Sequence, residues 1–374
     1  MAPRILLLSS YHAQSHEYWA NTITHHIQDV EWTQLTLPAR FFSWRTRGNS
    51  LTWGLGDYPQ LAAEYDLIIA TSMVDISALR GFRPNLATVP LIVYFHENQF
   101  AYPWSKHQVM DINIPLTSIY SAACADQVLF NSEYNRQSFF TGAKQLLDKM
   151  PDGIPANLIA NIRRNSSVLP VPLDLPITPT LTLAPKTPLK VVWNHRWEYD
   201  KNPEAMLAVF EALARSNLPF SGAIVGQSFR DSPKCFKQIT PRLRACLKHF
   251  GYLSASDYRS CLNDSTIVLS TAWHDFQGLA MQMAMAHGCI PIAPNRVAYS
   301  EYIPSSLLYS VADNGSKAAA IAEESEQILN KFEYLYHNGF AEQTNSVSDY
   351  HQSQLIPPYR ALIASLVKSY KATT

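Results

Sequence analysis

One stretch of the sequence combines two cations with a predicted helix start, as a diphosphate site requires. It reads Asn194-His195-Arg196-Trp197-Glu198-Tyr199-Asp200-Lys201, and Pro203 follows it. The arginine and the lysine precede a helix that Pro203 opens, so both positive charges would lie beside unpaired backbone N–H groups. This arrangement predicts a site for the diphosphate of a nucleotide. The alternative is a surface ion-pair cluster formed with Glu198 and Asp200.

A second polar cluster directly follows a continuously apolar run that is typical of a buried strand, Leu91 to Phe95. It consists of His96, Glu97, Asn98 and Gln99. In parallel sheets ligands lie at the carboxyl ends of the strands, so four hydrogen-bonding side chains at this point predict a ligand contact. The alternative is a capped turn that leads from the strand into its loop.

A third cluster, from Ser270 to Ala280, places an acidic residue before a glycine that opens a helix. Asp275 can bind hydroxyl groups there, with Phe276 beside it. Backbone N–H groups at Gly278 and Leu279 can approach phosphate or sugar oxygens, because glycine allows close approach. The alternative is that Asp275 only stabilises the helix start through its charge.

The first predicted strand ends at Ser9, and the loop behind it carries Ser15 and His16. We interpret this loop as part of an acceptor site. Ser15 acting as a helix cap explains the same residues nearly as well.

Arginines alternate with aromatic residues between positions 40 and 47. The arginines are Arg40, Arg45 and Arg47, and the aromatic residues are Phe41, Phe42 and Trp44. Cations interleaved with rings suit a flexible nucleic-acid strand, which offers both phosphates and unstacked bases. The alternative is an amphipathic loop that packs on the first domain.

Short apolar runs that alternate with helical patterns position these clusters, which is typical of parallel sheets with crossover helices. The expected strands are Arg4 to Ser9, Asp66 to Thr71, Leu91 to Phe95, Gln127 to Asn131, Leu189 to Asn194, Phe220 to Val225, Thr266 to Ser270 and Ile290 to Ala293. The expected helices include Glu17 to Ile27, Ile114 to Ala125, Pro203 to Ser216, Gly278 to His287 and Gln354 to Tyr370.

The pattern predicts an α/β protein of two doubly wound, Rossmann-like domains that face each other across a cleft. A proline-rich stretch without helical period separates them. We expect a first domain over 1–172, a linker over 173–188, a second domain over 189–345, and a C-terminal helical segment over 346–374 that packs back on the first domain.

Composition limits the class of protein. The 374 residues are 47% hydrophobic and 16% charged with zero net charge, which indicates a globular chain of two domains and no global nucleic-acid surface. No apolar run approaches the roughly 20 residues of a membrane span, so we expect a cytoplasmic protein. Five scattered cysteines favour reduced thiols. No Asp-x-Asp pair, phosphate-binding loop or dinucleotide fingerprint occurs, so we expect no metal.

The combination of Arg196 with Lys201, His96, and an acidic residue before Gly278-Leu279 resembles the retaining glycosyltransferases of the family-4 type, which have the GT-B fold. More narrowly, the chain is similar to the tRNA-queuosine α-mannosyltransferases from about Ile5 to Pro304. The strings that carry this narrower resemblance are Tyr94-Phe95-His96-Glu97-Asn98-Gln99, His195-Arg196-Trp197-Glu198, Asp200-Lys201, His287-Gly288-Cys289, Pro38-Ala39-Arg40, Trp44-Arg45 and Asn131-Ser132.

The resemblance implies GDP-mannose as donor and no metal, because two side-chain cations neutralise the diphosphate. It implies as acceptor the cyclopentene hydroxyl of queuosine in tRNA, at the anticodon wobble position, with tRNA-Asp as the expected tRNA. The expected catalytic residues are His96, Arg196, Lys201 and Asp275. The expected donor-binding residues are His195, Gly226, Gln227, Tyr252, Phe276, Gly278, Leu279 and Glu301. The expected acceptor residues are Ser15, His16, Arg40, Arg45, Arg47, Glu97, Asn98 and Gln99.

The sequence departs from the family pattern at two places. Two glutamates eight positions apart are usual, whereas here the positions hold Asp275 and Met283. The second glutamate usually holds the ribose, so another group, such as Glu301, is expected to do so. A Gly-Gly pair of the relatives reads Ala13-Gln14 here.

Two other functions remain open at this point. One is a family-4 glycosyltransferase that acts on a glycan, a lipid or a small metabolite. The other is a non-catalytic sugar-nucleotide-binding protein, which the loss of a carboxylate at Met283 suggests.

Overall fold

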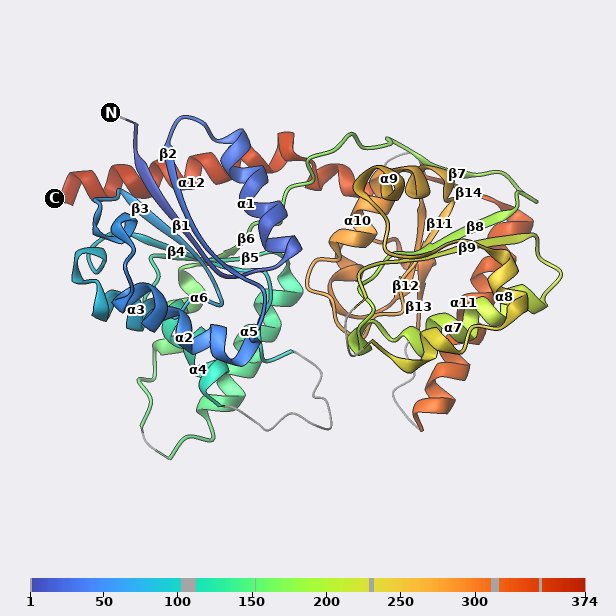
Figure 1. Cartoon of the computed structure of the whole chain (residues 1–374), viewed down its shortest axis with the longest axis horizontal. Coiled ribbons are helices and arrows are strands. Elements are labelled where there is room, and N and C mark those ends of the chain that lie inside the picture. Colours follow the sequence, from blue (N-terminus) through green and yellow to red (C-terminus); the bar gives the residue numbers. More distant parts are fainter. Residues whose placement is uncertain are drawn as a thin grey trace. The chain divides into compact units, whose positions relative to one another are not determined.

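The computed structural model describes residues 2–101, 112–151, 153–228, 232–310, 316–342 and 345–373. It divides into two compact units (Figure 1). Unit 1 contains Met1–Asp174 and Gln352–Thr374, and unit 2 contains Leu175–His351. Each unit is a parallel sheet covered by helices, as the alternating pattern predicted.

The sheet of unit 1 has the order β2-β1-β3-β4-β5-β6, and all its strand pairs are parallel. Its strands are β1 (Arg4–His12), β2 (Glu31–Pro38), β3 (Leu67–Thr71), β4 (Leu91–Phe95), β5 (Gln127–Phe130) and β6 (Ser166–Val168). Its helices are α1 (Gln14–His26), α2 (Phe42–Leu55), α3 (Ile76–Phe82), α4 (Asn113–Ala123), α5 (Glu133–Leu147), α6 (Leu158–Arg164) and α12 (Gln352–Thr373). The central strands are buried along their whole length, which explains their continuously apolar sequences.

The sheet of unit 2 has the order β10-β9-β8-β11-β12-β13, again with parallel pairs. Its strands are β8 (Leu189–Trp193), β9 (Phe220–Val225), β10 (Leu247–Gly251), β11 (Ile267–Leu269), β12 (Ile290–Pro294) and β13 (Leu308–Tyr309). Its helices are α7 (Pro203–Arg215), α8 (Pro241–Cys246), α9 (Ala255–Asp264), α10 (Leu279–Ala286) and α11 (Lys317–Asn338). The strand order reverses between β8 and β11. At such a reversal the loops behind the two strands diverge and leave room for a ligand.

The proline-rich stretch over 173–188, which we expected to be a linker, belongs mostly to unit 2. Residues from 175 onward belong to unit 2, and Leu181–Leu183 forms strand β7, which pairs antiparallel with β14 (Phe340–Glu342). Leu181 and Leu183 are buried, so this short stretch packs as a strand even though prolines surround it. The chain returns to unit 1 after His351 rather than after position 345.

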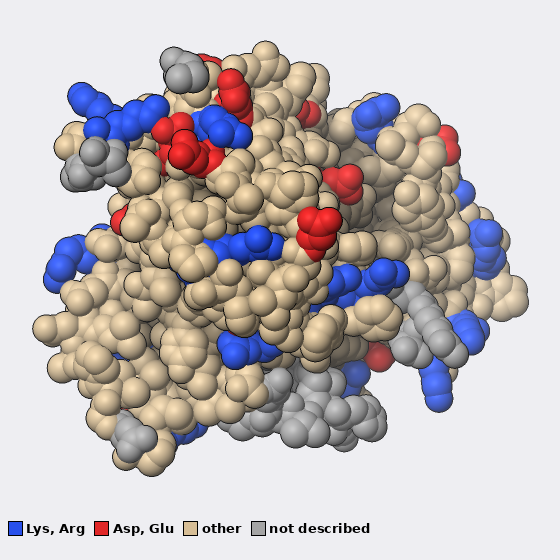
Figure 2. All heavy atoms as spheres, turned by 60° about the vertical axis from the view of Figure 1, so that its left-hand side comes forward, with Lys and Arg blue, Asp and Glu red and all other residues tan. Residues whose placement is uncertain are grey.

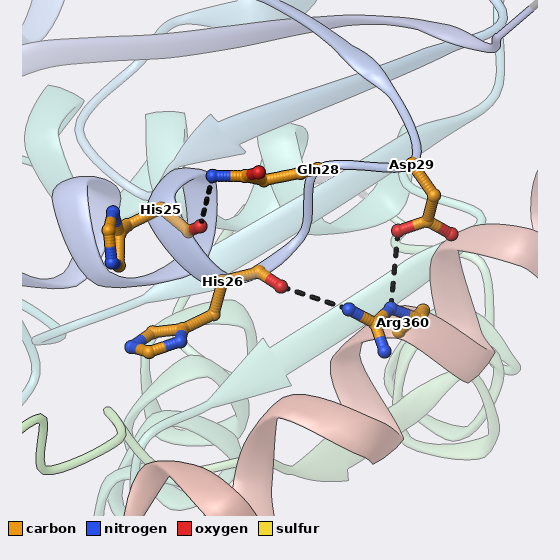
Figure 3. Close-up of a pocket in the computed structure, with 5 residues that line it drawn as sticks. All are labelled: His25, His26, Gln28, Asp29 and Arg360. Atoms are coloured by element: carbon orange, nitrogen blue, oxygen red, sulfur yellow. Dashed lines mark hydrogen bonds and ion pairs between the residues drawn. The ribbon is translucent and has the colours of Figure 1, made fainter.

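Helix α12 lies on unit 1 through specific polar contacts. The Tyr359 hydroxyl accepts a hydrogen bond of 3.1 Å from Trp19 Nε1 and lies 3.2 Å from the carbonyl oxygen of Leu169. Arg360 donates to the Asp29 carboxylate at 3.2 Å and to the carbonyl oxygen of His26 at 2.9 Å (Figure 3). These contacts join the last helix of the chain to the end of α1.

Two simpler features also emerge. No helix within the described ranges is both long enough and apolar enough to span a membrane. All five cysteines are free thiols, as their scatter predicted, and Cys235, Cys261 and Cys289 are buried.

Candidate active site

Two of the predicted clusters meet in unit 2, because the loop behind β8 is bonded to the loop behind β11. The Trp273 N–H donates to the Asp200 carbonyl oxygen at 2.8 Å. The Thr271 hydroxyl donates to the Lys201 carbonyl oxygen at 2.8 Å and accepts from Trp193 Nε1 at 3.2 Å. Residues about 70 positions apart in the sequence therefore form one polar site at the strand reversal.

Lys201 is the centre of this site, and its side chain is only 9% exposed. Its Nζ lies 3.1 Å from Asp200 Oδ2 and 3.9 Å from Asp275 Oδ2, and it donates to the His274 carbonyl oxygen at 2.6 Å. Burial alone would lower the pKa of Lys201, but Asp200 and Asp275 outweigh burial and raise it. The ammonium group is therefore charged and fixed in place.

Asp275 is charged for the complementary reason. Burial would raise the pKa of its carboxyl, but Lys201 and His195, together with a hydrogen bond from Tyr299, lower it. The Tyr299 hydroxyl lies 3.0 Å from Asp275 Oδ2 and 2.7 Å from the Ser270 hydroxyl. Tyr299 therefore positions the carboxylate, a role that no local sequence pattern indicated.

Arg196 is more accessible than Lys201. Its guanidinium lies 3.0 Å from Glu198 Oε2, and the two side chains are 44% and 30% exposed. Burial raises the pKa of Glu198 even though Arg196 opposes that shift. The surface ion pair that we considered as an alternative is thus present for Arg196 and Glu198. The pair of Lys201 with Asp200 is buried instead.

Two buried histidines complete the electrostatics of the site. Burial and the nearby Lys201 lower the pKa of His195 to about 4, and the same two causes lower the pKa of His274 to about 4. Both imidazoles are consequently neutral at neutral pH, so they add polar atoms without adding charge.

Two glycines allow the backbone to approach closely. A Cβ atom at Gly226 would lie 1.9 Å from the His195 carbonyl oxygen, so any side chain would displace the loop that carries Arg196. Gly278 has a φ of +80° at the start of α10, and a Cβ there would lie 2.4 Å from the Tyr302 hydroxyl. Both positions require glycine for steric reasons.

The remaining predicted donor residues differ in how far their side chains are buried. Phe276 is buried and Leu279 is half-buried. Gln227 is exposed, its carbonyl oxygen accepts from Trp197 N–H at 2.9 Å, and Tyr252 is 72% exposed behind β10. Glu301 is exposed at the end of a short 3-10 turn, Val297–Glu301. Met283 is half-buried on α10.

Arg296 is a positioning residue that sequence reasoning missed. It lies 3.0 Å from Glu324 Oε1 on α11, and it donates to the carbonyl oxygens of Ala272 at 2.8 Å and Thr271 at 3.2 Å. This pair of a half-buried arginine and a buried glutamate fixes the loop that leads to Asp275. Its partners are more than 20 residues away in the sequence, so no local pattern could have revealed it.

In unit 1, His96 lies in an aromatic cluster. Its ring centroid is 4.1 Å from that of His16, 4.9 Å from Trp19 and 4.7 Å from Tyr94. Burial, followed by His16 and His12, holds the pKa of His96 well below its usual value. The structure therefore joins two predicted residues, His16 and His96, in one buried aromatic cluster.

Asn98 differs from the expected ligand contact. Its amide nitrogen donates to the Asn135 side-chain oxygen at 2.8 Å and the Ser138 hydroxyl at 2.9 Å, and its oxygen accepts from Phe100 N–H at 3.0 Å. It is 1% exposed. Asn98 is thus a loop anchor, as the capped-turn alternative proposed. Glu97 and Gln99 on either side are half-buried.

Other acceptor-side predictions are also corrected in part. Ser15 is exposed as the second residue of α1, and the cap position is Ala13, so Ser15 is not the helix cap. The segment with interleaved arginines and aromatic residues, for which an amphipathic loop was the alternative interpretation, is largely helix α2. Arg45 is 8% exposed and lies on the inner face of α2, which removes it from the surface. Arg40 and Arg47 are exposed.

The described residues contain no group of three or more histidine, cysteine, aspartate or glutamate side chains that could hold a metal ion. Arg196, Lys201 and the start of α10 are positive groups that the described part of this site offers to an anion. A bound diphosphate would find its counter-charges there.

The sequence matches one family model over residues 4–173, which is described as the N-terminal part of tRNA-queuosine alpha-mannosyltransferase. A tRNA-queuosine alpha-mannosyltransferase of Drosophila melanogaster is 31% identical over 323 residues, which cover 83% of this chain and 84% of that protein.

Solved structures show the fold. A glycosyltransferase from Rickettsia africae has a TM-score of 0.63 at 10% identity and covers 98% of this chain and 99% of its own. Anabaena HepE, solved with UDP and glucose, has a TM-score of 0.60 at 15% identity and covers 98% and 100%. The chain has the GT-B fold with two Rossmann-like domains, as expected.

The neutral histidines predict how stability depends on pH. Unfolded His195 and His274 take up protons below about pH 6.5, whereas the folded forms do so only near pH 4. The free energy of unfolding should therefore fall as pH decreases through this window, by up to about 1.4 kcal/mol per pH unit for each group. Urea unfolding of the wild type and of His274→Gln measures this. The variant should show the smaller slope, and equal slopes would contradict the assignment.

Proposed function

The chain belongs to the tRNA-queuosine alpha-mannosyltransferase family, and from this membership we propose that it transfers mannose from GDP-mannose to the cyclopentene hydroxyl of queuosine in tRNA. It is a glycosyltransferase. The observation that carries the donor half of the proposal is the fixed cation Lys201 beside the accessible cation Arg196, at the strand reversal of unit 2. The acceptor half rests on the family.

The cations act on the leaving group in this proposal. Negative charge develops on the diphosphate as the bond to mannose breaks, so cations already in place lower the barrier. Asp200, Asp275 and the His274 carbonyl oxygen hold Lys201 without a ligand, and no reorganisation is needed during the reaction. Arg196 exchanges Glu198 for phosphate oxygens when the donor binds.

The neighbouring groups orient the sugar. Asp275 binds sugar hydroxyls, and the backbone N–H groups at Gly278 and Leu279 bind oxygens of the donor at the start of α10. His96 of unit 1 contacts the sugar as a neutral imidazole. We propose that the reaction retains the anomeric configuration, with the leaving phosphate oxygen accepting the proton of the acceptor hydroxyl. No step in this scheme requires a metal.

The nucleoside part of the donor contacts the loops behind β9 and β10. Gly226 and Gln227 lie at the end of β9, and the exposed ring of Tyr252 offers a surface for guanine. His195 and Phe276 are buried and form the floor of the site. Because Met283 offers no carboxylate, Glu301 is our candidate for the ribose hydroxyls.

The acceptor side belongs to unit 1 in this proposal. Ser15, Glu97 and Gln99 contact the queuosine end of the acceptor, and His16 supports His96 from behind. A tRNA acceptor, for which tRNA-Asp is the first candidate, places the reaction in the cytoplasm.

The direct test incubates the protein with GDP-mannose and queuosine-containing tRNA and analyses the nucleosides by mass spectrometry. We expect the mass of one hexose to be added to queuosine. Tests with lipid, saccharide and metabolite acceptors run in parallel. A hexose on one of these and none on queuosine would indicate another acceptor. Binding of GDP-mannose with no transfer to any acceptor would indicate a non-catalytic protein, as Met283 suggests.

Arg196→Ala should lower kcat/KM, because one of the two cations that face the diphosphate is removed. The expected loss of transition-state stabilisation is about 2–4 kcal/mol. Initial rates of GDP release in the presence of tRNA measure this. Arg215→Ala is the control, since Arg215 is also an exposed arginine beside a glutamate, 3.7 Å from Glu211 at the end of α7. Near-normal turnover of Arg196→Ala would refute the diphosphate assignment.

A further inference from the structure

The outer face of helix α2 exposes large side chains. Phe41, just before the helix, is 72% exposed and Trp44 is 55% exposed. Leu51 and Leu55 follow on the same side, at 44% and 69%. Residues at this spacing share one face of a helix. The opposite face is buried and contains Arg45, Asn49 and Trp53.

The Trp44 ring is held in a defined orientation. A Cβ atom at Gly48 would lie 2.4 Å from Trp44 Cε2, so the indole lies directly against the helix at that glycine. A glycine inside a helix is less favourable than an alanine, and no turn or positive φ requires one at this position. Gly48 therefore leaves room for the indole of Trp44 to lie against the helix. The outer face of the indole remains open to solvent.

Phe41 is held in a strained backbone conformation. Its φ and ψ are both 55°, in the left-handed region that non-glycine residues seldom adopt. Such strain is unfavourable and tends to occur at functional sites. The guanidinium of Arg40 lies 5.7 Å from the centroid of the Phe41 ring, so a cation and an exposed ring are presented together.

Two exposed arginines, Arg40 and Arg47, lie beside these rings in the sequence. Arg47 is half-exposed, and it binds the buried Asp75 at 2.9 Å and the Thr117 hydroxyl at 3.4 Å, which fixes its position and partly balances its charge. The sequence from Pro38 to Gly56 contains no aspartate or glutamate, and its third arginine, Arg45, is buried. On the face shown in Figure 2, basic side chains lie in separate groups and form no continuous basic field. Binding of a polyanion would thus depend on local groups.

We propose that Arg40, Phe41, Trp44 and Arg47, the α2 platform, bind unpaired bases and phosphates of the anticodon loop of the acceptor tRNA. Exposed rings stack unpaired bases, and arginines neutralise the phosphates between them. An apolar protein partner would contact Leu51 and Leu55 as much as the rings, and it would offer the arginines no counter-charge. This inference rests on the proposed function and extends it by naming the docking surface.

The test measures binding of a fluorescently labelled anticodon stem-loop RNA that carries queuosine, by polarisation, with full-length protein. Trp44→Ala should raise Kd about 5- to 150-fold, the range that corresponds to about 1–3 kcal/mol per stacked base. Trp44→Phe should recover part of the affinity. Gly48→Ala should weaken binding by displacing the indole, although it favours the helix. Arg40→Gln should reduce the slope of log Kd against the logarithm of the salt concentration by about 0.7, because one phosphate contact is lost.

Leu55→Ala is the matched control, because it removes another exposed apolar side chain from the same helix, 69% exposed against 55% for Trp44. It should bind RNA like the wild type. The far-UV circular dichroism spectrum of each variant reports that unit 1 is folded, and GDP-mannose affinity, which depends on unit 2, should be unchanged in every variant. Wild-type affinity of Trp44→Ala would overturn the inference, and so would an equal loss in Leu55→Ala. If the wild type neither binds this RNA nor adds hexose to queuosine, the proposed function itself has failed.

Discussion

The site in unit 2 depends on a buried ammonium group, Lys201, held between two carboxylates and a carbonyl oxygen. A buried charge without partners is strongly unfavourable, so Lys201, Asp200 and Asp275 must be placed together. The two loops that carry them meet because β8 and β11 are neighbouring parallel strands, so both strands end at the same edge of the sheet. Arg196 lies on the same loop as Lys201 and is exposed. Thus the fold supplies one fixed cation and one accessible cation for an anionic ligand.

Much of this arrangement follows from the sequence. Strands β4, β8, β9 and β11 are short apolar runs, and each expected range agrees with the observed strand to within one residue at either end. Because parallel strands end at one edge of a sheet, the polar residues behind β8 and β11 were expected to meet, and they do. Each polar cluster alone has a plain structural explanation, and only the clusters together predict a ligand site.

The sequence could not reveal which polar groups are buried. The pairs Arg196–Glu198 and Lys201–Asp200 look alike in the sequence, yet only the second is buried, because Thr271 and Trp273 cover it from a distant loop. Asn98 anchors a loop through Asn135, a partner 37 positions away. Arg45 is on the inner face of α2, a helix that was not predicted from the sequence. Long-range contacts decide each case.

A crystal structure of the protein with GDP tests the central claim most directly. The account predicts that oxygens of the diphosphate lie about 3 Å from Lys201 Nζ and from the Arg196 guanidinium. Arg196 should then have left Glu198, whereas Lys201 should keep its contacts with Asp200 and the His274 carbonyl oxygen. A diphosphate bound away from both cations would contradict the account, as would one held by Arg196 alone with Lys201 shielded from it.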